Sequence, residues 1–167
     1  MEEDMSRLSD SIKQTLQSRH YATLATHNED GTIHTTPVWY LFENNTFYVG
    51  SNSSSRKTKN VVARPNATIM IDVRRPGGES WVYASGRVKI LEGDSAREIT
   101  SKILRRYLTD EAMGDPRIGP VFEATDDTTI CVVPEKWRSW NSRDVDERFF
   151  GGILTSTPEK WFRPVDR

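Results

Sequence analysis

Two runs rich in β-branched and aromatic residues, 21–26 and 32–42, flank the tetrapeptide Asn-Glu-Asp-Gly at 28–31. Asn, Asp and Gly tolerate the left-handed backbone that tight turns require, so this arrangement predicts two antiparallel strands joined as a hairpin. A third strand over 46–51 follows a second turn at 43–45 and predicts an antiparallel meander. Strands joined directly in this way exclude a parallel sheet in which strands and helices alternate.

The rest of the chain continues the β-rich pattern. Pro and Gly at 74–78 demand a turn between two of the strands. Further strands are predicted over 67–73, 80–91 and 128–133, the last ended by Pro134.

Helical spacing and capping residues mark three helices. The first covers 6–19, with Ser6 or Ser9 as its N-cap, and the second covers 53–63 and stops before Pro65. Asp94 is the expected cap of a third helix that runs through Tyr107. The tail from residue 149 contains two glycines and two prolines, which indicate an irregular extension.

Charge and cysteine content exclude several classes of function. The chain has 23 Lys and Arg against 24 Asp and Glu, so it offers no basic surface for nucleic acid. Its single cysteine, Cys131, forms no internal disulfide and is expected to be a buried, inert strand residue. An acidic start and the lack of a long apolar run predict no secretory signal and no membrane span. We therefore expect a cytoplasmic protein.

The segment 48–60 runs from a strand into a helix among serines and cations. Hydroxyls and free N–H groups at a helix start donate hydrogen bonds to phosphate, and Arg and Lys add charge-assisted contacts. Ser51, Ser55, Arg56 and Lys57 are the candidate phosphate ligands. By composition alone, a solvated, capped helix with a basic face is the favoured interpretation.

A proline lies inside the strand predicted over 32–42, within the sequence His-Thr-Thr-Pro-Val-Trp-Tyr at 34–40. Pro37 has no N–H for a sheet ladder, so it predicts an edge strand or a bulge. Backbone N–H groups of Thr36 or Val38 would then be free to bond the polar atoms of a planar heterocycle. An ordinary edge strand is the alternative interpretation.

Five segments in this order and spacing resemble the pyridoxamine 5′-phosphate oxidase-like family of FMN-binding split barrels, over about residues 8–141. They are Ala-Thr-Leu-Ala-Thr at 22–26, Thr-Thr-Pro-Val-Trp at 35–39, Ser-Arg-Lys at 55–57, Arg-Pro-Asn-Ala at 64–67 and Gly-Arg-Val at 86–88. The resemblance implies a mainly β, antiparallel split barrel with peripheral α-helices, in a homodimer with two cofactor sites at its interface. It also implies a barrel domain over 1–145 and a C-terminal extension over 146–167 that packs on the barrel or on the partner subunit. The cofactor-binding residues that it implies are Thr35, Thr36, Pro37, Val38, Trp39, Ser51, Ser55, Arg56, Lys57, Trp137 and Trp140.

The chain departs from the family in one respect that bears on activity. Pyridoxamine phosphate oxidases carry a late Arg-x-His pair that handles substrate, whereas no histidine follows His34 here. The late Lys-Trp-Arg-Ser-Trp at 136–140 resembles instead the flavin- and deazaflavin-dependent reductase branch. For a deazaflavin coenzyme with an acidic tail, Lys59, Arg74 and Arg75 are candidate contacts.

We therefore expect an FMN-dependent oxidoreductase that acts on a small-molecule substrate, with a nicotinamide as a candidate electron donor. The alternatives are a deazaflavin-dependent reductase, a non-catalytic flavin carrier or sensor and, more remotely, a heme-binding protein. No catalytic residue is predicted, since the cofactor itself carries the redox chemistry. No metal site is predicted either, because His20, His27 and His34 do not share one strand face.

Overall fold

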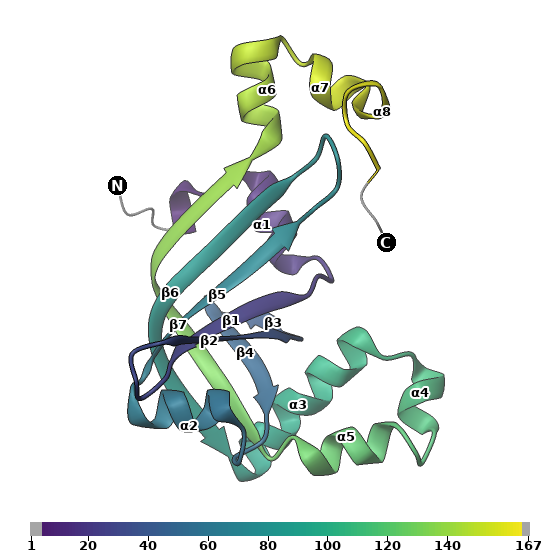
Figure 1. The fold of residues 1–167 in the computed structure, drawn as a ribbon. Coiled ribbons are helices and arrows are strands. Elements are labelled where there is room, and N and C mark those ends of the chain that lie inside the picture. The colour runs from purple at the N-terminus through teal and green to yellow at the C-terminus, as the bar shows by residue number, and fades with distance from the viewer. Residues whose placement is uncertain (1–4, 165–167) are drawn as a thin grey trace.

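The computed structural model describes residues 5–164, without the side chain of residue 7, and shows a curled sheet with helices at both ends (Figure 1). The acidic start and the last three residues of the predicted extension lie outside this range. Within the described range, seven strands pair antiparallel in the order β2-β1-β5-β6-β7-β4-β3. The strands are β1 Ala22–His27, β2 Ile33–Val38, β3 Leu41–Glu43, β4 Thr46–Ser51, β5 Asn66–Val73, β6 Ser80–Glu92 and β7 Thr128–Asn141. The predicted mainly β class and split-barrel architecture are confirmed.

The helices flank this sheet. A 3₁₀ turn, Met5–Arg7, precedes α1, and α2 packs on β1 and β2, while α3 packs on β4, β6 and β7. The bounds are α1 Asp10–Gln17, α2 Arg56–Ala63, α3 Gly93–Tyr107, α4 Asp110–Gly114, α5 Gly119–Thr125, α6 Ser142–Phe150, α7 Ile153–Ser156 and α8 Pro158–Trp161.

The predicted meander is wrong in its strand order. β2 and β3 occupy opposite edges of the sheet, although only Trp39 and Tyr40 separate them in the chain. Three Cα steps span at most about 11 Å, so the two edges must approach each other at this end. The single strand expected over 32–42 is therefore two strands, and the link between them curls the sheet into a barrel.

The two hairpin turns follow the predicted chemistry. In the β1–β2 turn, Gly31 has a φ of 83°, and the Asp30 carboxylate accepts hydrogen bonds from the amide and hydroxyl of Thr32 at 3.0 and 2.6 Å. In the β3–β4 turn, Asn44 and Asn45 have φ values of 50° and 53°. Both turns hold the left-handed backbone that Asn and Gly tolerate best.

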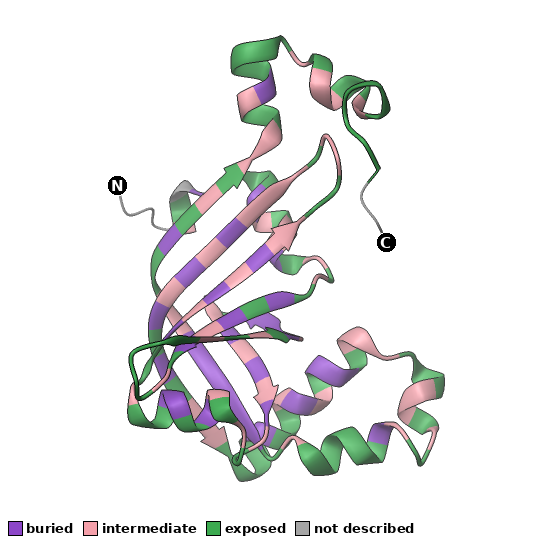
Figure 2. Ribbon diagram, viewed as in Figure 1, coloured by how far each residue is buried: buried purple, intermediate pink, exposed green. Residues whose placement is uncertain are grey.

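Burial alternates along the strands, as Figure 2 shows most clearly on β5 and β6. The inward side chains form one core with α1, whose Ile12 and Leu16 are each 1% exposed. The hydroxyl of Ser9 accepts a hydrogen bond from the Ile12 amide at 3.4 Å, so Ser9 rather than Ser6 is the N-cap. Predicted burial of Cys131 is confirmed, and that burial raises the pKa of its thiol to about 11.

Three sequence expectations are corrected. Pro134 does not end the last strand, because a register shift opposite Ser85 and Gly86 accommodates it and β7 continues to Asn141. Asp94 pairs with Arg97 inside the first turn of α3 and is not the cap. The tail is helical rather than irregular, and Gly151 ends α6 in the left-handed conformation.

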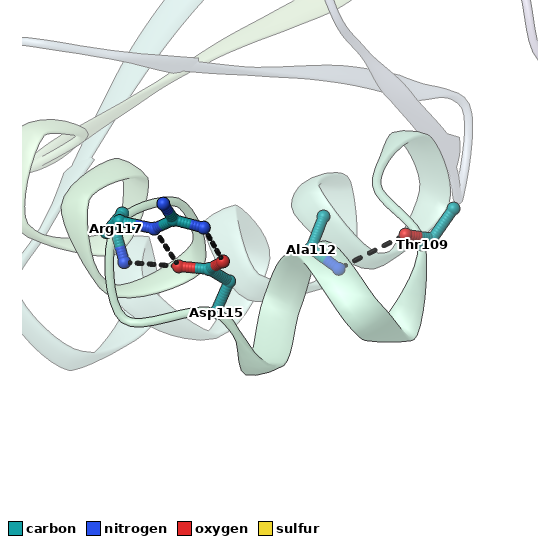
Figure 3. Close-up of polar contacts among 4 residues, drawn as sticks. All are labelled: Thr109, Ala112, Asp115 and Arg117. Atoms are coloured by element: carbon teal, nitrogen blue, oxygen red, sulfur yellow. Dashed lines mark hydrogen bonds and ion pairs between the residues drawn. The ribbon is translucent and has the colours of Figure 1, made fainter.

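Two short helices, α4 and α5, extend the chain away from the barrel after α3 and were not predicted. The hydroxyl of Thr109 caps α4 by accepting from the Ala112 amide at 3.1 Å (Figure 3). The Asp115 carboxylate then accepts from the amide, Nε and Nη2 of Arg117 at 2.9, 3.0 and 2.6 Å. These local bonds set the turn that leads into α5.

The β6–β7 bulge requires glycine at position 86. A Cβ on Gly86 would lie 1.9 Å from the Val133 carbonyl oxygen, so Gly86→Ala must break the β6–β7 bulge. We expect a loss of about 3 kcal/mol or more of unfolding free energy, measured by urea denaturation. Gly114→Ala, where a Cβ meets nothing within 4 Å, is the matched control and should be neutral or stabilising. Equal stabilities for the two variants would contradict this account of the bulge.

Candidate functional site

The two segments singled out in the sequence meet at one cleft. The cleft has a volume of about 150 Å³ and lies between the end of β2 and the place where β4 leads into α2. A second hollow of about 230 Å³ shares four of its residues and adds Tyr21. We call the first hollow the candidate cleft; its lining residues are Pro37, Val38, Trp39, Gly50, Lys57, Ile103, Phe122 and Asp126.

β2 supplies one wall of this cleft. It is an edge strand that pairs only with β1, with Pro37 opposite Thr23, so the predicted edge position of the proline is confirmed. Thr35 is exposed on this strand, and the Thr36 hydroxyl lies 2.7 Å from Nε2 of His34. Pro37 and Val38 line the cleft, whereas Thr35 and Thr36 do not, and no described strand pairs the outer edge of β2. The alternation that turns the Pro37 nitrogen outward places the amides of Thr36 and Val38 on the β1 side.

Aromatic rings cover the cleft at its β2 end. Trp39 stacks on Tyr107 of α3 with centroids 5.1 Å apart and planes 4° apart, and it meets Phe122 of α5 at 5.6 Å. The Tyr107 hydroxyl donates a 2.6 Å hydrogen bond to the His20 carbonyl. This stack fixes the outward-facing indole and attaches the α3–α5 segment to the barrel.

The predicted phosphate segment holds a compact group of hydroxyls. Ser51 is 1% exposed, and its oxygen lies 3.1 Å from that of Ser55 and 2.8 Å from that of Thr58. The Ser55 hydroxyl also caps α2 by accepting from the Thr58 amide at 3.4 Å. Helix α2 thus begins at Arg56 rather than at residue 53, and these hydroxyls bond one another.

Asn52 and Ser53, just before the cap, hold a neighbouring loop by hydrogen bonds. The amide and hydroxyl of Ser53 donate to the Asp127 carboxylate at 2.7 and 2.8 Å, and Asn52 donates to the Thr125 carbonyl at 2.9 Å. Hydrogen bonds from the Thr128 hydroxyl and then from Ser53 lower the pKa of Asp127. This part of the segment holds the loop between α5 and β7.

Arg56 and Lys57 face different hollows. Lys57 lines the candidate cleft, whereas Arg56 lines a hollow of about 580 Å³ together with Asn28, Glu29, Asp30 and His34. Consecutive helical residues point about 100° apart, which accounts for the separation. The structure therefore does not gather Ser55, Arg56 and Lys57 into one clamp, and Lys57 is the cation among the residues that line the cleft.

Asp126 lies in the cleft and was missed in the sequence. Burial raises the pKa of its carboxyl, the positive charge of Lys57 lowers it, and Asp127 raises it, with a net increase. A Cβ on Gly50 would lie 2.9 Å from Oδ2 of Asp126 and 3.8 Å from the Thr100 hydroxyl. No sequence signal marks Asp126, because its neighbours Gly50 and Lys57 lie about seventy positions earlier in the chain.

The two late tryptophans lie in different environments. Trp137 is 2% exposed in the barrel core, against Phe42 and Phe47, so we omit it from the proposed site. Its core position follows from the bulge, which the sequence did not reveal. Trp140 is 39% exposed further along β7, opposite Trp81, and does not line the candidate cleft of its own chain.

The cations considered for an acidic coenzyme tail are also dispersed. Lys59 is exposed on α2, whereas Arg74 bonds Asp72 and Arg75 lies in the β5–β6 turn. That turn and α2 lie at opposite ends of the barrel (Figure 1), separated by the eight residues of β5, or about 25 Å. One tail cannot contact all three within a single chain.

The described residues, 5–164, contain no candidate metal cluster and no candidate membrane span. No cluster of three or more His, Cys, Asp or Glu side chains in this range is arranged to hold a metal ion. None of the helices in the same range combines the length and apolar character needed to cross a membrane.

Solved structures share this fold at low sequence identity. A conserved hypothetical protein from Mycobacterium tuberculosis matches with a TM-score of 0.68 and 22% identity, covering 83% of this chain and 88% of its own. A structure described as an F420 reductase matches with a TM-score of 0.63 and 21% identity, over 78% and 98% of the two chains. A FAD-binding protein from Mesorhizobium loti matches with a TM-score of 0.57 and 19% identity, over 79% and 94%.

A search of curated proteins found none that matches this chain. The family model for pyridoxamine 5′-phosphate oxidase, in contrast, matches residues 8–141. That range includes every strand of the sheet and all residues that line the candidate cleft. The chain therefore belongs to the pyridoxamine 5′-phosphate oxidase family.

Proposed function

We propose that this protein binds a flavin-type cofactor, FMN or a deazaflavin coenzyme, in the candidate cleft and acts as an oxidoreductase on a small molecule. The observation that carries the proposal is that Lys57 lines the same cleft as Pro37, Val38 and Trp39. The names of two structural neighbours, an F420 reductase and a FAD-binding protein, agree with a cofactor of this class.

The residues of the cleft fit such a cofactor. Trp39 and Phe122 offer apolar faces for a flat heterocycle, and Lys57 offers a cation for a phosphate. The Thr100 hydroxyl is buried without a hydrogen-bond partner among the described residues, and it lies 3.8 Å from the position of a Cβ built on Gly50, which lines the cleft. An unpartnered buried hydroxyl is suited to a polar ligand atom.

The protein's own contribution is to bind, orient and exclude water. When bound, the cofactor supplies hydride or electron transfer, so no acid or base of the protein is required for that step. Lys57 would hold the phosphate, and Trp39 and Phe122 would contact the ring. With no histidine after His34, the late Arg-x-His pair of vitamin B6 oxidation is missing, and we propose a different substrate.

We propose a homodimer, because the cleft of one chain is small. The cleft, at about 150 Å³, and the adjoining hollow, at about 230 Å³, each fall below the roughly 300–1,000 Å³ typical of small-molecule sites, and together they reach only the lower end of that range. A second copy would supply the missing wall. Exposed aromatic side chains after β7, with Phe149 65% and Phe150 50% exposed, offer apolar area for that contact.

Light scattering tests the homodimer. We expect a particle of twice the chain mass of 19.1 kDa at micromolar concentration, with one cofactor bound per chain. On dilution below the dissociation range, cofactor affinity should fall together with the dimer. A monomer that retains tight cofactor binding would contradict the proposal that two chains build each site.

Cofactor identity is tested on protein purified from its native source. Absorbance distinguishes oxidised flavin, deazaflavin and heme, and mass spectrometry of the released molecule identifies it. Turnover with a reduced nicotinamide then separates an enzyme from a carrier. Heme, or no cofactor at all, would refute the proposed class.

Substitution of Lys57 tests the site itself. A charge-assisted contact to phosphate is worth about 1.5–3 kcal/mol, so Lys57→Ala should weaken FMN roughly tenfold to a hundredfold in a fluorescence titration. Riboflavin, which lacks the phosphate, should bind nearly unchanged. Lys59→Ala removes the same charge from the exposed side of α2 and is the matched control. If FMN affinity responds equally to both substitutions, Lys57 is only part of a basic helix face.

A further inference from the structure

The loop between α5 and β7 places a carboxylate in the candidate cleft. Asp126 lines the cleft together with Lys57, and its Oδ2 would lie 2.9 Å from a Cβ built on Gly50. Any side chain at position 50 would crowd this oxygen. The carboxylate therefore lies directly beside the backbone of β4, next to the buried Ser51.

Hydrogen bonds hold the loop at Thr125 and Asp127, the two residues next to Asp126 in the chain. Asn52 donates to the Thr125 carbonyl at 2.9 Å, and Ser53 donates twice to Asp127, at 2.7 and 2.8 Å. These bonds join the loop to the start of the predicted phosphate segment. The position of Asp126 in the cleft is consequently set by the same residues that lead into α2.

Two charged groups act on Asp126. Lys57 faces it from α2 and favours the carboxylate, whereas Asp127, next in the chain, opposes it. Burial raises the pKa of Asp126 by more than Lys57 lowers it. A bound anion beside Lys57 would add a further negative charge and favour the protonated carboxyl still more.

We propose that Asp126 is a specificity-determining residue, whose carboxylate competes with the phosphate of the cofactor for Lys57. The anion then binds either with transfer of a proton from solvent to the Asp126 carboxylate or with movement of that carboxylate out of the cleft. Neutral ligands do not meet this competition. The inference rests on the proposed binding of a phosphate-bearing flavin in this cleft.

Asp126→Asn tests the proposal, because the substitution should change the affinity for FMN but not the affinity for riboflavin. The amide is isosteric and removes the negative charge, so FMN should bind about tenfold more tightly near neutral pH, whereas riboflavin should change by less than about twofold. Fluorescence quenching gives both affinities. Glu123→Gln, an exposed position on α5 three residues earlier, removes an equal charge outside the cleft and should leave both affinities unchanged.

The pH dependence gives a second measure. As pH falls through the raised pKa of Asp126, FMN affinity of the native protein should rise toward that of Asp126→Asn, because the competing charge disappears. The phosphate of FMN titrates near pH 6 by itself, but this ionisation is common to both proteins and cancels in their ratio. Calorimetry in two buffers should show greater proton uptake on FMN binding for the native protein than for Asp126→Asn.

The outcomes separate this inference from the proposed function. Equal FMN affinities and equal pH profiles for the native protein and Asp126→Asn would overturn the role of Asp126 while leaving the flavin site in place. Tighter binding of both FMN and riboflavin would also overturn it, because the effect would then be independent of the phosphate. Failure of native and variant protein alike to bind FMN or a deazaflavin would overturn the proposed function, and the inference with it.

Discussion

The passage of the chain from β2 to β3 through Trp39 and Tyr40 is the constraint on which the barrel depends. Tyr40 is fully buried, and its hydroxyl lies 3.1 Å from the carbonyls of both Leu16 and Ser18 at the end of α1. Burial raises the pKa of this phenol to about 12, so the hydroxyl keeps its proton and remains a donor. One side chain thus fixes the crossing between the two sheet edges and attaches the first helix to it.

The same crossing creates the outer wall of the candidate cleft. Trp39, next to the buried Tyr40, is only partly buried and lines the cleft. Trp39 then stacks on Tyr107, whose hydroxyl is held by the His20 carbonyl, and Phe122 follows from α5. The position of the α3–α5 segment, and with it of Asp126, is therefore a consequence of how the barrel closes.

Features with a local physical cause could be predicted from the sequence. The turn at 28–31, the serine cap of the first helix and the edge position of Pro37 each depend on residues a few positions apart. The resemblance to a family supplied the closed barrel, which local patterns could not. Features that depend on distant partners were missed: Pro134 inside a strand needs the bulge opposite Gly86, and the core position of Trp137 follows from that bulge. Likewise, nothing near Asp126 indicates a lysine from α2.

The serine-rich segment shows why composition alone cannot define an anion site. The hydroxyls of Ser51, Ser55 and Thr58 bond one another, Ser53 bonds Asp127, and Ser54 bonds Asn52. A phosphate in the cleft would have to compete with these partners for each donor, and such an exchange gains little net free energy. The balance of charge at Lys57 then has the larger effect on anion affinity, because Coulomb attraction is stronger in a partly buried cleft than in water. A single carboxylate at position 126 opposes that attraction, so the loop that closes the cleft also sets its preference for charge.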